Sequence, residues 1–149
     1  SPIGMDNSIV YDRTNLNELI IPTQGYENKT PWEDVYLNGV VGDKGIYSTT
    51  MDLLKFDRAL QENLLINDTL KKLAFSKKNK DYNKNKNYGY GFRLKDHTNY
   101  GKIVYHTGWW KGYRSYFIKV LKNDQTIIVL NNVKRGRFLN IDKLIGLIN

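Results

Sequence analysis

The second half of the chain alternates apolar and polar residues with a period of two. The alternation falls into four runs separated by short polar turns: residues 88–94, 103–107, 116–121 and 126–130. A period of two indicates half-buried strands, and short turns favour antiparallel neighbours. The fourth run, Thr126–Leu130, is apolar at consecutive positions, so we expect both of its faces to be covered. The pattern predicts an antiparallel sheet of about four strands across residues 88–132.

A helical period comes before the strands. One face carries apolar residues at three- and four-residue spacing: Leu53, Phe56, Leu60 and Leu64. This spacing predicts an amphipathic helix over residues 50–63. Thr49, with Asp52 three residues later, resembles the capping box that starts many helices.

Two further helices are predicted. Asn67–Asp68 can cap a short one, with Leu70, Leu73 and Ala74 facing inward. A C-terminal helix over residues 138–148 is indicated by a set of apolar residues at helical spacing: Phe138, Ile141, Leu144, Ile145 and Ile148.

The segments together fit one α+β domain over residues 1–149. Residues 1–45 are loop-rich, with short strand-like pieces at Ile9, Tyr11, Leu19 and Ile21. Residues 46–75 are helical, 88–132 form the strands and 138–148 the last helix. A block of antiparallel strands with helices before and after it predicts helices that pack against one sheet.

The composition excludes several kinds of functional site. The chain has no cysteine, which excludes disulfides, thiol nucleophiles and cysteine-ligated metals. Its two histidines have no tight carboxylate cluster beside them, so we expect neither a metal nor another cofactor. No run approaches about 18 apolar residues, so we expect no membrane span in this chain.

The net charge of +8 is compatible with an acidic partner, but its distribution weakens that interpretation. Seven of the basic residues lie between Lys71 and Lys86. The Lys/Asn-rich stretch from Asn79 to Asn87 fits either a contact for phosphate or an acidic partner, or a solvated insertion, which is the commoner origin of such charge runs. No helix-turn-helix, RNA-binding or zinc pattern is present, so we expect no nucleic-acid partner.

The strongest candidate for a site is the stretch Tyr105–Phe117. It holds one of two histidines, two of three tryptophans and two glycines. His106 alone is weak evidence, because a single histidine on a strand is more often an exposed polar residue than a functional one.

Four segments in order resemble the serine β-lactamase-like and penicillin-binding-protein family, which includes class C β-lactamases, D,D-peptidases, D-aminopeptidases and esterases. Residues 1–5 resemble its E-P-L-G-M segment, and residues 42–56 are similar to its G-x-G-G-L-x-S-T-x-x-D-L-x-x-F helix entry. Tyr88–Phe92 resembles its Y-G-x-G-W strand. His106-Thr107-Gly108, with Gly112 four residues later, resembles its Lys/His-Thr-Gly box. The ordered set covers nearly the whole chain and implies a partial β-lactamase/transpeptidase-like fold.

Two motifs of the resembled family are missing. Its Ser-x-x-Lys nucleophile motif does not occur in the 149 residues. Its Tyr-x-Asn motif is matched only by Tyr26-Glu27-Asn28, which lies downstream of the expected place and is treated as a chance match. The resemblance therefore implies the C-terminal portion of a serine hydrolase, inactive by itself, whose partner is the missing N-terminal portion of the same protein.

The resemblance implies catalytic roles for His106, Thr107, Gly108 and Trp109. In acyl transfer, negative charge develops on a carbonyl oxygen, and backbone N–H groups can stabilise it. In the resembled family one donor belongs to the nucleophile and the other to the residue after Thr-Gly, here Trp109. His106 replaces the lysine of β-lactamases, which shifts weight toward peptidase or esterase relatives, since histidine titrates near neutral pH.

Three further residues are substrate-binding candidates: Trp110, Tyr113 and Arg114. Trp109-Trp110 fits either an aromatic wall against a substrate or a hydrophobic lid over the core. Tyr113 and Arg114 could hold a substrate carboxylate, although Arg114 could equally face solvent.

Two hypotheses for function remain. The first is the C-terminal portion of a serine hydrolase that acts on a small D-amino-acid peptide, β-lactam or ester, in the periplasm or at the surface of a bacterium. The alternative is a non-catalytic binding module for an acidic or cell-wall polymer. The resemblance also implies that Thr126–Leu130 and the last helix lack their usual cover, so we expect a homodimer through residues 126–132 or that helix.

Overall fold

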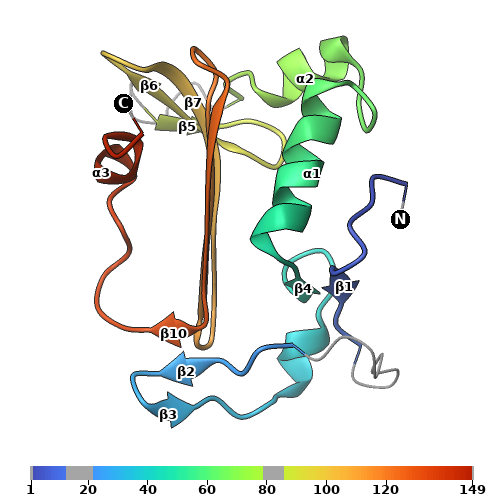
Figure 1. Ribbon diagram of the computed structural model, residues 1–149, viewed down its shortest axis with the longest axis vertical. Helices are drawn as coiled ribbons and strands as arrows, with labels where there is room; N and C mark the ends of the chain where they lie inside the picture. Colours follow the sequence, from blue (N-terminus) through green and yellow to red (C-terminus); the bar gives the residue numbers. More distant parts are fainter. Residues whose placement is uncertain (1, 13–21, 79–85, 149) are drawn as a thin grey trace.

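A five-stranded antiparallel sheet forms the centre of the computed structural model, which describes residues 2–12, 22–78 and 86–148. Its strands, in spatial order, are β5 (Lys86–Tyr88), β6 (Arg93–His97), β7 (Gly101–Trp110), β8 (Tyr113–Val120) and β9 (Gln125–Asn131). Each strand pairs with the next one along the chain, so the sheet is a meander. Figure 1 shows it nearly edge-on, with α1 (Thr50–Gln61) and α2 (Asp68–Ala74) on one side and α3 (Ile141–Ile145) on the other. The α+β class is confirmed.

The sheet has one more strand than the alternation predicted, because the run 88–94 is divided. β5 ends at Tyr88 and β6 begins at Arg93, with a turn between them. A Cβ on Gly89 would lie 1.9 Å from the carbonyl oxygen of Ala74, and Gly91 has φ +76°. Gly89 and Gly91 therefore form a turn that packs against the end of α2. The alternation had predicted an extended strand at these positions.

The start of α1 follows the predicted cap, but its buried face is partly polar. The Thr49 hydroxyl accepts a hydrogen bond from the Asp52 amide at 3.1 Å. The buried Asp52 carboxylate turns to the N-terminal segment and accepts bonds from the Asn7 amide and the Ser8 hydroxyl, both at 2.8 Å. Burial opposes the charge, but these bonds and Lys55 outweigh it and lower the pKa of Asp52. Asp52 thus fastens the N-terminal segment to the helix.

The expected inward positions are wrong in three places. Leu64 lies beyond α1 and is exposed. Asn67 caps α2 as predicted, through a 2.9 Å bond from the Leu70 amide, but Leu70 and Leu73 are exposed and only Ala74 is buried. This seven-residue helix therefore buries little of its apolar stripe.

The C-terminal helix is shorter than predicted. α3 begins after Asn140, whose side chain accepts from the Asp142 amide at 2.8 Å, and it ends at Ile145. Phe138 precedes the helix, and its ring lies 6.0 Å from that of Tyr116. Ile145 is fully buried against the sheet.

Short elements complete the fold around the sheet. β1 (Ile9–Val10) pairs with β4 (Ile46–Tyr47), and β10 (Val133–Lys134), β2 (Tyr26–Glu27) and β3 (Thr30–Pro31) form a small sheet. This small sheet lies below the β7–β8 hairpin tip in Figure 1. A 3₁₀ turn, η1, spans Tyr36–Gly39. The pieces expected at Leu19 and Ile21, and most of the Lys/Asn-rich stretch (79–85), lie outside the described residues.

The two faces of the sheet are packed differently. The α3 face carries an apolar cluster whose buried members are Ile103, Tyr105, Tyr116, Ile118, Val120 and Ile145. The α1 face combines a ring contact, Phe56 against Phe117 at 6.0 Å, with a buried ion pair. The Lys119 ammonium lies 3.1 Å from Asp57 on α1 and 2.6 Å from Asp124 after β8.

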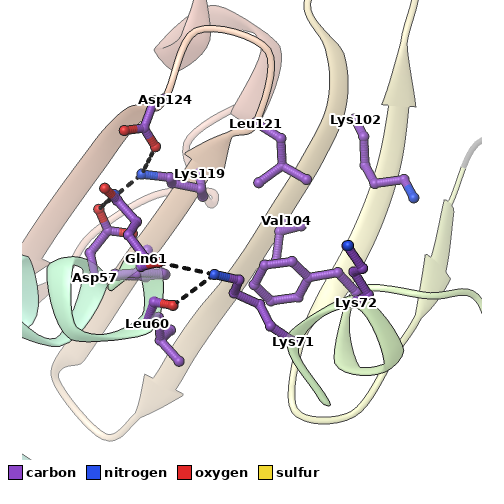
Figure 2. A pocket seen from close by; sticks show the side chains of 12 residues that line it. Asp57, Leu60, Gln61, Lys71, Lys72, Lys102, Val104, Lys119, Leu121 and Asp124 are labelled. Carbon is purple, nitrogen blue, oxygen red and sulfur yellow. Dashed lines mark hydrogen bonds and ion pairs between the residues drawn. The ribbon is translucent and has the colours of Figure 1, made fainter. Parts of the chain in front are cut away.

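Asp57 has further partners that complete this buried network. Its carboxylate accepts bonds from Gln61 at 2.7 Å and from Thr126 on β9 at 2.8 Å. The side chains of Asp57 and Lys119 are each only 6% exposed. Figure 2 shows the ion pair in the wall of a cavity of about 490 Å³ between α1, α2 and the sheet. The network fixes where α1 lies on the sheet.

Replacing Asp57 with Ala should lower the free energy of unfolding by about 3 kcal/mol, because Lys119 would keep only one of its two carboxylates in a buried place. The double variant Asp57→Leu/Lys119→Met should lose less, since no unpaired charge remains. Urea denaturation measures both. Lys72→Ala, which breaks an exposed pair with Asp68, is the control and should leave the midpoint unchanged. A double variant less stable than Asp57→Ala would contradict the account.

Self-association stays a prediction. β9 lies at one end of the strand order, so its outer edge has no partner strand among the described residues. An open apolar edge is a template for pairing. We expect a dimer through residues 126–132 or the final helix, detectable by solution scattering. A chain that stays monomeric at high concentration would count against it.

Candidate functional site

One edge of β7 is unpaired over its second half. The β6–β7 ladder ends at the pair Arg93–Tyr105, whereas the β7–β8 ladder continues to Trp110–Tyr113. From His106 to Trp110, therefore, one edge of β7 meets β8 and the other meets no strand in the described part of the chain. We call residues 106–110 on this side the open edge.

Strand geometry decides which backbone donors reach the open edge. The β7–β8 connection has two residues, so Trp110 and Tyr113 form the hydrogen-bonded pair that closes the hairpin. Along an antiparallel strand, successive N–H groups point to opposite sides. The amides of Gly108 and Trp110 thus point to β8, and those of Thr107 and Trp109 point to the open edge.

Gly108 lies against the side chain of Ser115 on β8. A Cβ at 108 would lie 2.2 Å from the Ser115 hydroxyl but 3.6 Å from its Cβ, an ordinary contact. A side chain at 108 would therefore require the Ser115 hydroxyl to rotate away. At the hairpin tip, a Cβ on Gly112 would lie 2.1 Å from the Tyr26 amide nitrogen, so β2 holds the tip closely.

His106 is joined to Tyr88, a residue that sequence reasoning did not place in the site. The Tyr88 hydroxyl lies 2.9 Å from His106 Nε2, and the two rings meet edge to face. Burial lowers the pKa of His106, and the positive charge of Arg93 lowers it further. The imidazole is therefore neutral near pH 7, and Nδ1 has no protein partner among the described residues. The tyrosine that opens the Tyr88–Phe92 motif was the only signal for this contact.

Trp110 and Tyr113 are fastened to the N-terminal segments. Trp110 Nε1 donates to Asn38 Oδ1 at 2.7 Å, and the Lys44 ammonium lies 4.5 Å from the indole. The Tyr113 hydroxyl donates to the carbonyl oxygen of Thr23 at 2.6 Å. Strand alternation places Trp110 on the His106 face of β7. Their role in substrate binding stays a prediction.

Arg114, Thr107 and the Trp109 indole are not brought together with His106. Alternation places Thr107 and Trp109 on the opposite face of β7, and Arg114 is the cross-strand partner of Trp109. Arg114 is 8% exposed and donates to the carbonyl oxygens of Arg135 and Gly136, at 3.3 and 2.8 Å. Its guanidinium therefore holds the chain after β10, whereas Trp109 is 56% exposed.

Over residues 2–12, 22–78 and 86–148, no three or more His, Asp or Glu side chains gather in a way that could hold a metal ion. Within the same ranges, no helix combines the length and apolarity that crossing a bilayer requires.

Comparison with known proteins identifies the family. Residues 7–147 match the family model described as Beta-lactamase, and the chain belongs to this family. It is 32% identical over 145 residues to penicillin-binding protein 4* of Bacillus subtilis (strain 168), an alignment that covers 88% of this chain and 32% of that protein. The chain thus spans about a third of the curated relative's length.

Solved structures confirm the fold. A penicillin-binding protein of Bacillus halodurans superposes with a TM-score of 0.73 at 20% identity, covering 91% of this chain and 42% of that one. An octameric penicillin-binding protein homologue of Pyrococcus abyssi gives 0.71 at 20% identity, with 89% and 31% covered. The D-amino acid amidase of Ochrobactrum anthropi SV3, complexed with D-phenylalanine, gives 0.70 at 18% identity, with 89% and 42% covered.

We predict that His106 titrates below the ordinary histidine value of 6.5. Ring NMR signals followed against pH measure this, with His97→Gln to assign the second histidine. Because the folded pKa is depressed, the stability that the neutral imidazole contributes is present above pH 6.5 and is lost as the pH falls through the folded pKa. Arg93→Gln should raise the His106 pKa, while Arg58→Gln should not. A His106 pKa at or above 6.5 would contradict the described environment.

Proposed function

We propose that this chain forms the oxyanion side of the active site of a serine acyl hydrolase. The observation that carries the proposal is the Trp109 amide on the open edge of β7, next to Gly108 and beside the neutral His106. A donor already fixed by the strand needs no rearrangement when charge develops on a substrate, which is the condition for oxyanion stabilisation.

The reaction would be acyl transfer. A nucleophilic hydroxyl adds to the substrate carbonyl, the carbonyl oxygen becomes negative, and its charge is stabilised by the Trp109 N–H. The tetrahedral species then collapses as the amine or alcohol leaves with a proton. This chain contains no Ser-x-x-Lys, so the nucleophile would come from an N-terminal portion of the same protein. His106, being neutral, would offer a hydrogen bond where a lysine offers a fixed charge.

The open edge also suggests how a substrate lies. An extended peptide-like ligand can pair with the free Thr107 and Trp109 amides as an added strand. A small D-amino-acid peptide, a β-lactam or an ester with an amide-like backbone fits this arrangement. The names of the relatives, penicillin-binding proteins and a D-amino acid amidase, support this class. They also support a bacterial, cell-wall-related setting at the periplasm or cell surface.

A second candidate is a binding module for an acidic or cell-wall polymer, as the alternation of tryptophans with lysines at the hairpin tip would allow. Lys111 lies 4.6 Å from the Trp32 ring and 5.7 Å from the Trp110 ring, and Lys134 lies 5.9 Å from both the Trp32 and Trp109 rings. Each of these tryptophans already has a lysine ammonium near its ring, which leaves less ring surface for a polymer and favours the hydrolase proposal. Polymer binding through the charges would be strongest at low salt.

Trp109→Pro in the full-length gene product tests the proposal. Proline at 109 removes the N–H that faces the open edge and leaves the amides of Gly108 and Trp110, so β8 pairing survives, as at other edge positions. Acylation by a fluorescent penicillin or an activated ester should slow by about 10²- to 10³-fold. Trp109→Ala keeps the amide and should slow it far less.

Two results would contradict the proposal. One is equal acylation rates in the Trp109→Pro and Trp109→Ala proteins. The other is covalent labelling of the present 149-residue chain by itself, since it would show that a nucleophile other than the missing Ser-x-x-Lys operates.

A further inference from the structure

Arg93 lies at the corner where β6 leaves β7. It is the first residue of β6 and the last to pair with β7, opposite Tyr105, and on its other side it pairs with Tyr88 of β5. The open edge begins one residue later, at His106. Arg93 is also exposed, so a ligand along the open edge would have this guanidinium at one end.

Among the described residues, Arg93 differs from its basic neighbours because no acidic side chain pairs with it. Within the described ranges, Lys77 pairs with Asp96 and Lys95 with Asp142. Arg93 makes neither an ion pair nor a side-chain hydrogen bond there. Arg114, the arginine that the sequence offered as a substrate-binding candidate, donates to the backbone carbonyl oxygens of Arg135 and Gly136.

A short chain of contacts ties Arg93 to the candidate site. Its guanidinium lies 5.8 Å from the centre of the Tyr88 ring, and the Tyr88 hydroxyl lies 2.9 Å from His106 Nε2. Its charge reaches the imidazole, since it helps to keep His106 neutral. In this set of contacts, the only permanent positive charge is therefore that of Arg93 on β6. The residue of the His-Thr-Gly motif on β7, His106, is neutral.

We infer that Arg93 is a specificity-determining residue that binds the carboxylate of a ligand lying along the open edge, with Tyr88 holding the guanidinium and His106 in place. The planar guanidinium can accept a carboxylate through two parallel hydrogen bonds, which a neutral imidazole cannot offer. The ligand class is an N-acylated amino acid or short peptide with a free carboxylate. The inference rests on the proposed function for the location of the ligand, but it concerns binding and needs no nucleophile.

The test uses the 149-residue chain and two matched ligands, N-acetyl-D-phenylalanine and its neutral carboxamide. Binding is followed by NMR at the Arg93 side-chain Nε–H and the His106 ring. We expect the acid to bind about fivefold more tightly than the amide, the upper range for a pair at a partly exposed place. Arg93→Gln should remove this preference, and Arg93→Lys should keep part of it.

Arg58→Gln, which removes an exposed guanidinium from α1, is the matched control and should keep the full preference. Equal affinity for acid and amide in the natural chain, a preference that survives Arg93→Gln, or no saturable binding of either ligand would each overturn the inference. These outcomes leave the proposed function open, because that proposal is tested by acylation rates with Trp109→Pro.

Discussion

β7 is ten residues long, but β6 accompanies it only as far as Tyr105. The remaining five residues are held on one side alone, by β8, and the alternation of the backbone then directs the Trp109 amide to the free side. The candidate site depends on this early end of the β6–β7 pairing, because it leaves the Trp109 amide without a partner strand. Gly108 lies against Ser115 of β8, and His106, Tyr88 and Arg93 gather where β6 departs.

The position of β7 in turn depends on polar contacts that hold α1. Asp57 binds Lys119 and Thr126 on two strands, while Asp52 binds the N-terminal segment. Both carboxylates lie on the buried face of a helix whose apolar spacing was clear. The spacing therefore predicted a helix at 50–63. It could not predict that two carboxylates attach this helix to the rest of the fold, because an aspartate on a helix is exposed far more often than it is buried.

Much of the fold and part of the site could be predicted from sequence. Alternation and capping residues predicted the α+β class, the sheet and the starts of α1 and α2, since these are local properties. The motif residues indicated His106, Gly108 and Trp109. Tyr88 and Arg93 escaped notice because the order of the strands brings the ends of β5 and β6 beside His106, and short-range patterns do not encode strand order. Arg114 was proposed as a ligand because it is near in sequence, yet its guanidinium donates to the backbone carbonyl oxygens of Arg135 and Gly136.

The central claim is that the Trp109 amide is the oxyanion donor supplied by this chain. The most direct measurement is a crystal structure of the full-length gene product acylated or trapped by a boronic acid. We expect a ligand oxygen about 2.7–3.1 Å from the Trp109 nitrogen, with the ligand along residues 106–110 of β7. A trapped ligand whose oxygen is held elsewhere, or a Trp109 amide bonded within the protein, would contradict it.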